Sequence, residues 1–378
     1  MPEITQYWEN DLGLTPTRHL FAAAPGRKKF TIIDEPHFAE GYTLIAGLTP
    51  GKKAWLGVVL YDRTGREVHY WPIDYDQLDP DGPPPQNVYM HGVVIYEDGS
   101  LIVSFDDGNV LVKLSLNGDI MWKTPGHFHH QISKSFDGSI WTWEGEGRHQ
   151  FMTQVNPENG QVIRRISLID DVIIPQDLQG QFAIRTYKSE NGLKWFHDPF
   201  HANDIEVLYP PMAKAFPAFA AGDLLISLRE LNLVAVLDSR DYKVKWSTIG
   251  PWFRQHDADF LADGSIALLN NNMGFGKSHI MKVFPRTGMV ETVGVEGSGV
   301  PFYTWQRGCQ QHLENGNFLV TDSEHGRAFE LSPRGELVWE FHNIYDEERN
   351  GVINKADRLP LNFFTPDVLR EFGSPAVN

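Results

Sequence analysis

One short pattern recurs along the chain and limits its fold more than any other feature. An apolar residue is followed by a turn that contains Gly or Asp, and then by a strand that often ends in Trp. Six copies are visible, at 60–71, 114–122, 155–165, 237–246, 283–293 and 331–339. Five of them have an upstream strand that follows its own turn, at 97–105, 136–144, 221–229, 262–270 and 315–323. Repeats of roughly 35–50 residues made of short strands are typical of propeller blades, so we predict an all-β, six-bladed β-propeller.

The two ends of the chain fit this repeat less well. The first unit is more degenerate, and the segments EGYTLIAGL and AWLGVVLYD supply its strands. Prolines in the first residues indicate an irregular arm that lies across the ring or adds an outer strand, and the segment TPDVLREFGS starts like a helix. We therefore predict an N-terminal arm at 1–36, the propeller at 37–342 and a tail with a short helix at 343–378.

Two long inserts interrupt the regular spacing of the repeat. They are residues 169–198, between the third and fourth units, and residues 209–220, within the fourth unit. Their prolines keep both inserts out of the sheets, and loops of this length in a compact domain are usually functional or mobile. We expect both to lie near the mouth of the central channel and to act as lids.

Composition narrows the classes of partner and the compartment. The formal net charge of −16 argues against nucleic acid and against an anionic membrane surface as partners. The N-terminus does not have the pattern of a signal peptide, and no run of about 18 apolar residues is present. A single cysteine, Cys309, fits a reducing compartment. These features predict a soluble, cytoplasmic protein, which could form a homo-oligomer, and any anionic ligand would need a few local cations.

Three histidines share one position relative to the repeat. Each lies eight residues before the glycine of a turn, as His91 before Gly99, His130 before Gly138 and His256 before Gly264. The innermost strand of each blade runs along the channel, and this offset places the residue at the start of that strand. The three histidines are therefore predicted to meet at one end of the channel.

Other polar residues are expected at the same end. In the segment FHANDIEV, His201 and Asn203 precede the inner strand of the fourth unit, and Arg229 ends the strand LLISLR. Arg254 stands two residues before His256, whereas the sixth unit offers Cys309, Gln310 and Gln311 in place of a histidine. Imidazoles and guanidinium groups together suit a divalent or tetrahedral anion, with His91, Asn203 and Arg254 as further contacts to a substrate. Crowded cationic groups also lower the pKa of each histidine, which leaves one free to act as a nucleophile.

These segments resemble a known family. HANDIEV with LLISLRELN, then QHDADFLADGSIALLNN, then NGNFLVTDSEHGRAFELSPRGELVWEF, are similar to the arylsulfotransferases, and the resemblance covers roughly residues 88–342. Members of that family are six-bladed propellers that move a sulfuryl group from an aryl sulfate to a phenol through a sulfohistidine, independently of 3'-phosphoadenylyl sulfate. The resemblance thus implies no cofactor, and an aryl sulfate and a phenol as small-molecule partners.

The resemblance also implies a role for each matching residue. His256 would be the nucleophile that becomes sulfated, while Arg229, His201 and Asn203 would bind the sulfuryl oxygens. His130, in the segment GHFHHQ, is similar to the histidine that the family uses beside them.

The chain departs from the family pattern in three ways. The usual motif HxNS is replaced by HAND, so Asp204 adds a carboxyl group where an anion should bind. The insert 209–220 lies between the histidine and the arginine of one blade, which predicts a rebuilt pocket mouth. Enterobacterial members are exported, disulfide-bonded and carry an extra N-terminal β-domain, and this sequence shows none of these features.

Structural roles are the alternative for several of these side chains. His256 could tie blades together through backbone hydrogen bonds, and His91 could be structural as well. Arg229 could serve only to pair with Asp257 or Glu230. His127 and His129 are expected to shape the loop around their neighbour, and the tryptophans are expected to pack between blades rather than to form a substrate shelf.

Two other classes of function remain open from the sequence alone. One is a metal-dependent propeller lyase or hydrolase whose ligands would be His91, His130, His201 and His256. The sequence has no HxH or carboxylate ligand pattern, and Arg229 would be an awkward neighbour for a cation, so we predict no metal. The other is a binding propeller without chemistry, which the fold alone never excludes.

Overall fold

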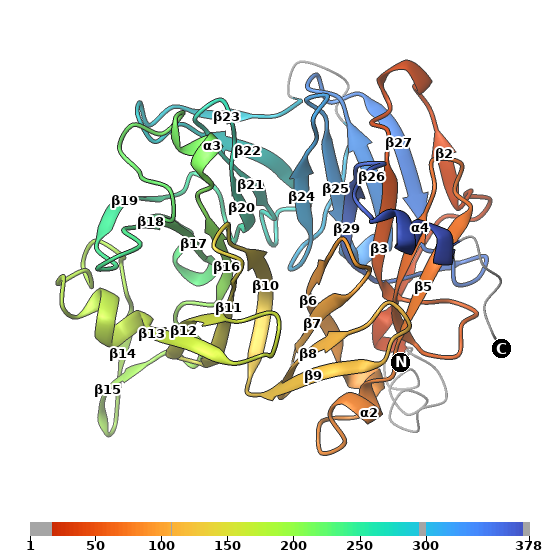
Figure 1. Ribbon diagram of the computed structural model, residues 1–378. Helices are drawn as coiled ribbons and strands as arrows, with labels where there is room; N and C mark the ends of the chain where they lie inside the picture. Colours follow the sequence, from red (N-terminus) through yellow and green to blue (C-terminus); the bar gives the residue numbers. More distant parts are fainter. Residues whose placement is uncertain (1–16, 107, 295–299, 373–378) are drawn as a thin grey trace.

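The structure is a computed structural model that describes residues 17–106, 108–294 and 300–372. Six antiparallel sheets surround a central channel as the blades of a propeller (Figure 1). The predicted all-β, six-bladed propeller is therefore confirmed. The start of the predicted arm and the last residues of the predicted tail lie outside the described residues.

Each blade has four strands, named below from the channel outward. Blade one contains β29 (Ile353–Leu359), β3 (Tyr42–Leu48), β4 (Leu56–Tyr61) and β5 (Glu67–Ile73). Blade two contains β6 (Tyr89–Ile95), β7 (Leu101–Asp106), β8 (Val110–Leu114) and β9 (Ile120–Pro125). Blade three contains β10 (Phe128–Lys134), β11 (Ile140–Glu146), β12 (His149–Val155) and β13 (Val162–Ser167).

The other three blades follow the same order. Blade four contains β16 (Ala202–Val207), β17 (Leu224–Leu228), β18 (Leu233–Leu237) and β19 (Val244–Ile249). Blade five contains β20 (His256–Phe260), β21 (Ile266–Asn270), β22 (His279–Val283) and β23 (Val290–Thr292). Blade six contains β24 (Cys309–His312), β25 (Phe318–Asp322), β26 (Arg327–Leu331) and β27 (Leu337–His342), and β2 (Phe30–Ile32) from the N-terminal arm adds an outer strand.

The repeated turn joins the first two strands of a blade in the same way each time. In blades two, three and five the sequence is Asp-Gly-Ser, and the glycine has a φ of 77°, 84° and 84°, in the region that side chains disfavour. The aspartate accepts hydrogen bonds from both the backbone N–H and the hydroxyl of the serine two residues later. The turn therefore lies at the far end of each hairpin, and the strand start eight residues earlier lies at the opposite end.

The core of the protein lies between neighbouring blades. The second strands, such as β17 and β21, are buried over their whole length because both faces of the sheet are covered. Trp143 is fully buried, and its indole N–H donates to the carbonyl of Asp204 in the next blade at 2.9 Å. Burial stabilises the fold by about 1.5–3 kcal/mol for each Val, Leu, Ile or Phe side chain. The packing role expected for Trp141, Trp143 and Trp305 holds for Trp141 and Trp143, which are both buried, whereas Trp305 is exposed.

The ring is closed by the C-terminal part of the chain. β29 is the inner strand of blade one and pairs with β3, so the first blade combines strands from both ends of the sequence. The propeller therefore extends to Leu359, beyond the boundary at 342 that the sequence predicted. The first repeat looked degenerate because its innermost strand comes from the other end of the chain. The short helix α4 (Pro366–Phe372) then buries Val368 against blades one and two.

The remaining elements are short. β1 (Leu20–Ala22) pairs with β28 (Arg349–Gly351), and β14 (Thr186–Ser189) pairs with β15 (Gly192–Trp195) in the insert 169–198. The other helical turns are η1 (Thr17–His19), η2 (Glu35–His37), α2 (Tyr75–Leu78), η3 (Pro85–Asn87), η4 (Leu168–Ile173), α3 (Pro210–Ala213), η5 (Arg229–Leu231) and η6 (Ser323–His325). Within the described residues, no helix has the length and apolar character needed to cross a membrane.

The two inserts lie at opposite ends of blade four, as Figure 1 shows for α3 and for β14 with β15. Residues 209–220 connect β16 to β17 at the turn end, where Phe216 and Phe219 are buried in the core and Ala215 touches Gly264. This insert therefore does not cover the strand starts, which corrects the expectation that it rebuilds the mouth of the histidine pocket. Residues 169–198 lead directly into β16 and lie at its starting end.

Candidate functional site

A β-bulge interrupts the inner strand of four successive blades near its start. The register shifts lie between Met90 and Val93, His129 and Ile132, Ala202 and Asp204, and His256 and Asp259. A bulge leaves an extra residue unpaired and redirects its side chain. His130 and His201 have φ values of 60° and 44°, which are unusual for residues with a side chain. The local backbone thus turns these side chains out of the sheets.

Most of the redirected side chains line one pocket at the end of the channel, whereas His201 is not among the lining residues and lies beside His130. The lining of the pocket includes His91, His130, Asn203 and His256, and its empty volume is about 490 Å³, including space open to solvent. One ring nitrogen from each of His130, His201 and His256 lies within 4.8 Å of the others. The histidines that the sequence placed at one end of the channel are therefore brought together.

The hydrogen bonds of His256 fix which of its nitrogens is free. The side-chain amide of Asn271 donates to the carbonyls of Thr304 and Arg307 at 2.8 and 2.7 Å, so its oxygen must face His256. That oxygen lies 2.7 Å from Nδ1 of His256 and accepts its proton. Burial, and then the charge of Arg229, hold the pKa of His256 well below its ordinary value, so the ring is neutral. Nε2 of His256 therefore carries a lone pair.

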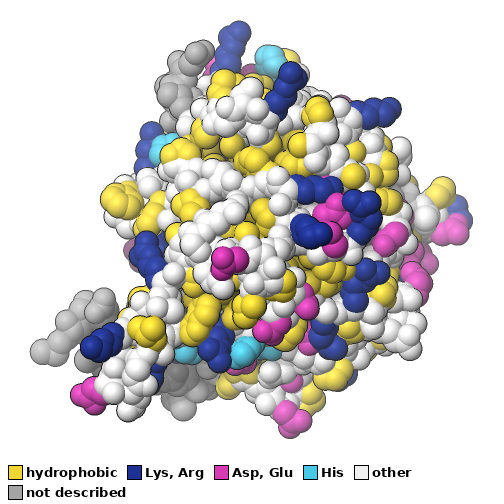
Figure 2. Space-filling view, turned by 90° about the vertical axis from the view of Figure 1, so that its left-hand side faces the viewer, with side chains coloured by type: hydrophobic (Ala, Val, Ile, Leu, Met, Phe, Trp, Pro, Cys, Tyr) yellow, Lys and Arg dark blue, Asp and Glu magenta, His cyan; other side chains and the backbone are white. Residues whose placement is uncertain are grey.

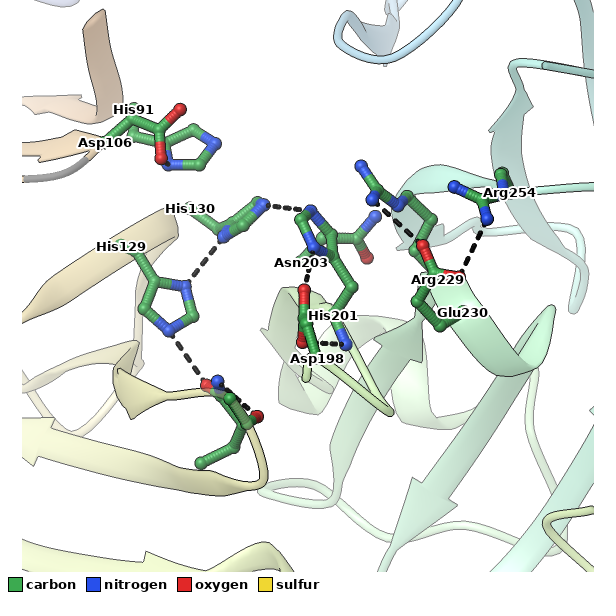
Figure 3. A network of polar contacts seen from close by, with 12 residues as sticks. His91, Asp106, His129, His130, Asp198, His201, Asn203, Arg229, Glu230 and Arg254 are labelled. Carbon is green, nitrogen blue, oxygen red and sulfur yellow. Dashed lines mark hydrogen bonds and ion pairs between the residues drawn. The ribbon is translucent and has the colours of Figure 1, made fainter. Parts of the chain in front are cut away.

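The imidazoles of His129, His130 and His201 contact one another in a row, which ends at Asp198 in the insert 169–198 (Figure 3). The amide of Gln150 donates to the carbonyl of Gly147, so its oxygen accepts from Nε2 of His129 at 2.9 Å. Burial lowers the pKa of His129 to about 3 and that of His130 well below its ordinary value, so both rings are neutral. Nδ1 of His129 then accepts from Nδ1 of His130 at 2.7 Å.

His201 contacts a different group through each of its ring nitrogens. Because Nδ1 of His130 donates, its Nε2 is an acceptor, and the Nε2 of His201 at 3.2 Å must be the donor. On its other side, Nδ1 of His201 donates to the carboxylate of Asp198. Burial acts to raise the pKa of Asp198, but the contact with His201 lowers it more. The pKa of Asp198 is therefore below its ordinary value. His201 therefore lies between the carboxylate of Asp198 on one side and the ring of His130 on the other.

Two arginines share a single acidic partner. Arg229 and Arg254 both bond Glu230, at 3.0 and 2.9 Å, and Figure 3 shows Glu230 between them. The ion pair between Arg229 and Glu230, one of the structural alternatives, is therefore present. It does not use all of the guanidinium, because the Nε of Arg229 is buried without a hydrogen-bond partner among the described residues. Arg254 does not line the pocket and also contacts the sulfur of Met273.

Asn203 and His91 complete the predicted set. Asn203 is buried and donates one amide hydrogen to the carbonyl of Gln255 at 2.7 Å, which leaves its second N–H for another acceptor. The ring of His91 lies 3.8 Å from that of His130, and burial lowers its pKa to about 4. The carboxylate of Asp106 lies 3.8 Å from Nδ1 of His91.

Sequence reasoning missed Arg307, which also lines the pocket. Its guanidinium stacks over Tyr89 at 4.0 Å and lies 3.6 Å from Glu324 and 4.0 Å from Asp106. A signal was present, because Arg307 stands two residues before the start of β24, as Arg254 stands two residues before the start of β20. Asn271 and Asp198 were also missed. They act through their neighbours in space and have no motif of their own.

Asp204 does not place a charge in the pocket. Its side chain is buried and accepts from the backbone N–H of Ala258 at 2.7 Å, which ties blade four to blade five. Burial, and then the charge of Asp259, raise its pKa well above the ordinary value. The departure from the family motif thus has a structural role, away from the anion.

The fold and the pocket define a class: propellers with a cationic, histidine-rich site at one end of the channel. The family model for arylsulfotransferase (ASST) matches residues 127–344, more than half of the chain. The chain belongs to the arylsulfotransferase family.

Solved structures agree on the fold. A protein of unknown function from Bacteroides caccae is 13% identical with a TM-score of 0.57, over 84% of this chain and 98% of that one. TolB from Acinetobacter baumannii is also 13% identical, with a TM-score of 0.49, over 85% of this chain and 67% of that one. At such identity the first likeness shows the propeller fold alone. No curated protein matches the chain.

Proposed function

We propose that the protein transfers a sulfuryl group from an aryl sulfate to a phenolic acceptor through a sulfated His256. The observation that carries this proposal is the position of the free lone pair. Asn271 occupies Nδ1 of His256, so the lone pair lies on Nε2, and the ring lies in one cluster with His130 and His201. The charge of Arg229 also acts on this ring, and a neutral nucleophile near a fixed cation suits attack on an anionic group.

In the first step, Nε2 of His256 attacks the sulfur of the donor. The bond between sulfur and the aryl oxygen breaks, and the phenolate leaves with the electron pair and takes a proton from solvent. The positive charge that develops on the ring is shared with Nδ1–H, whose proton is held by the oxygen of Asn271 at 2.7 Å. In the second step, the oxygen of the acceptor phenol attacks the sulfur, the nitrogen–sulfur bond breaks, and the phenol proton is lost to solvent.

The other side chains bind the three sulfuryl oxygens. His201 offers its Nε2–H, Asn203 its second amide hydrogen, and Arg229 the buried Nε–H that has no partner among the described residues. Donors fixed in advance around a transferring group stabilise its charge in the transition state without reorganisation. Neutral His130 keeps the Nε2–H of His201 in place between turnovers.

The test follows release of the phenol from an activated aryl sulfate, with and without an acceptor phenol. We expect release that depends on the acceptor, and a loss of about 10³-fold or more in His256→Asn. Without acceptor, the intact mass of the wild-type protein should increase by one sulfuryl group, on His256. His312→Asn, at the far end of β24, is the matched control and should keep full activity. Release that persists in His256→Asn would refute the proposal.

A further inference from the structure

The imidazoles of His130, His201 and His256 form a cluster whose ring nitrogens can reach one ion. The Nε2 atoms of His130 and His201 are 3.2 Å apart, and one ring nitrogen from each of the three histidines lies within 4.8 Å of the other two. In a zinc site the metal–nitrogen bonds are about 2.0–2.1 Å, so two ligating nitrogens on one ion lie roughly 3.3 Å apart. Rotation of the rings would have to bring the third nitrogen to the same distance.

Each of the three rings also has its other nitrogen held in the way that metal ligands require. Nδ1 of His130 donates to His129, that of His201 to the carboxylate of Asp198, and that of His256 to the oxygen of Asn271. Such outer partners fix the ring orientation and direct Nε2 at the metal. The contact between His201 and Asp198 is a carboxylate–histidine pair, an arrangement that recurs around zinc ligands.

The neighbouring cations do not forbid a metal ion. Arg229 has Glu230 as partner, and Arg307 lies near both Asp106 and Glu324. Asp198 brings a further carboxylate to the edge of the cluster. The local acidic groups therefore offset much of the repulsion that the arginines would exert.

We propose that His130, His201 and His256 bind a divalent transition metal ion such as Zn²⁺, and that the metal excludes the sulfuryl group. The proton that His201 shares with His130 leaves to solvent when the metal takes both Nε2 atoms. Three imidazole ligands leave a fourth coordination position open. Because the metal also takes Nε2 of His256, it removes the proposed nucleophile and acts as a reversible inhibitor. The binding rests on the side-chain geometry alone, and only the inhibition depends on the proposed function.

The test uses Co²⁺, whose visible absorption reports its coordination, added to the purified full chain in the absence of substrate. We expect one ion per chain, a spectrum typical of tetrahedral nitrogen coordination, and displacement by Zn²⁺. Each of His130→Asn, His201→Asn and His256→Asn should weaken binding by about 100-fold or more, and Asp198→Asn by about 10- to 100-fold. His279→Asn, outside the cluster, controls for surface imidazoles and should bind as the wild type does.

Stability gives a second measurement, since a metal that binds only the folded state raises the melting temperature. Zn²⁺ should stabilise the wild type and His279→Asn but not His256→Asn. The proposal would be overturned if Co²⁺ gave no tetrahedral spectrum, or if His256→Asn bound Co²⁺ as tightly as the wild type does. If one of the three histidine variants does not fold, the other two decide. If the protein binds Co²⁺ but the metal-free protein releases no phenol, only the proposed transfer is refuted. Phenol release without Co²⁺ binding would refute only the metal site.

Discussion

At the scale of single residues, the pocket is organised by what the second nitrogen of each histidine does. Asn271 is the clearest case, since its two donor bonds to carbonyls leave only its oxygen for His256. An amide that can face only one way selects one tautomer of the ring. The residue that decides which nitrogen of His256 can react is therefore an asparagine behind the ring, on the side away from the other histidines.

Asn271→Ala tests this role. We expect the rate of phenol release to fall by about 100-fold, because the ring of His256 is no longer held in its orientation and tautomer. The free energy of unfolding should fall by about 1–3 kcal/mol, since the carbonyls of Thr304 and Arg307 lose a buried donor. Steady-state kinetics and thermal unfolding measure both effects.

Ser278→Ala is the matched control for that variant. Its hydroxyl lies 2.9 Å from the backbone carbonyl of Asn271 and 3.2 Å from that of Thr304, but it makes no hydrogen bond to His256 or to the side chain of Asn271. We expect a comparable loss of stability with activity kept. If Ser278→Ala lost as much activity as Asn271→Ala, orientation of His256 would not be the reason for the loss.

At the scale of elements, the bulged start of each inner strand links the repeat to the site. The same turn fixes the far end of the hairpin, so an offset of eight residues locates the bulge in three blades. Left-handed backbone at His130 and His201 costs roughly 1–3 kcal/mol each, which the surrounding blades must offset. Hairpins of this kind position reactive side chains without any helix.

This regularity explains what the sequence could predict. Turn glycines and buried strands are local signals, and with the offset of His91, His130 and His256 they predicted the blades and the cluster. Asp198 and Asn271 could not be inferred, because no motif of their own marks them and their role depends on the folded neighbourhood. The sequence analysis also did not predict that β29 closes the ring. Pairing between strands from the two ends of the chain leaves no local pattern in the sequence.

Asp204 belongs to this scale because it joins β16 to β20. Its raised pKa means that the folded protein keeps a proton that the unfolded chain releases above pH 4, so the stability it contributes is lost as pH rises. Between the pKa of the unfolded chain and that of the folded protein, each pH unit lowers the free energy of unfolding by about 1.4 kcal/mol. The side chain of Asp204→Asn cannot ionise. Between pH 5 and pH 8 the free energy of unfolding of this variant should therefore rise, relative to that of the wild type, by on the order of 1–3 kcal/mol.

Denaturant unfolding at both pH values measures this change. Asp241→Asn alters an exposed carboxylate and serves as the control, with a difference from the wild type that stays nearly constant. If the difference in free energy of unfolding between Asp204→Asn and the wild type did not increase with pH, Asp204 would be ionised in the folded protein.

At the scale of the whole molecule, the net charge of −16 coexists with a pocket that has basic side chains gathered around it. On the face shown in Figure 2, basic and acidic side chains lie side by side. The basic groups around His256 sit at the channel end, where Arg229 and Arg254 share one carboxylate. The proposed anionic substrate would therefore be drawn to a local field rather than to the overall charge.

The integrity of the ring depends on its last inner strand. Ile353 and Ala356 are buried in the core, and Asn354 and Lys355 line the pocket, so β29 serves both the fold and the site. A chain that ends at Gly351 leaves β3 without its inner partner and opens the channel. We expect it to lose cooperative thermal unfolding and to aggregate, because an unpaired apolar edge strand is exposed.

A chain that ends at Phe364 is the matched truncation, because it keeps β29 and loses only α4. Removing Val368 from the core should lower the free energy of unfolding by about 2–3 kcal/mol while leaving one cooperative transition. A peptide that spans residues 352–372, added to the shorter chain during refolding, should restore both the transition and the pocket. If the chain that ends at Gly351 unfolded as sharply and at the same temperature as the full chain, the ring would not need β29, and the first blade would have to be stable with three strands.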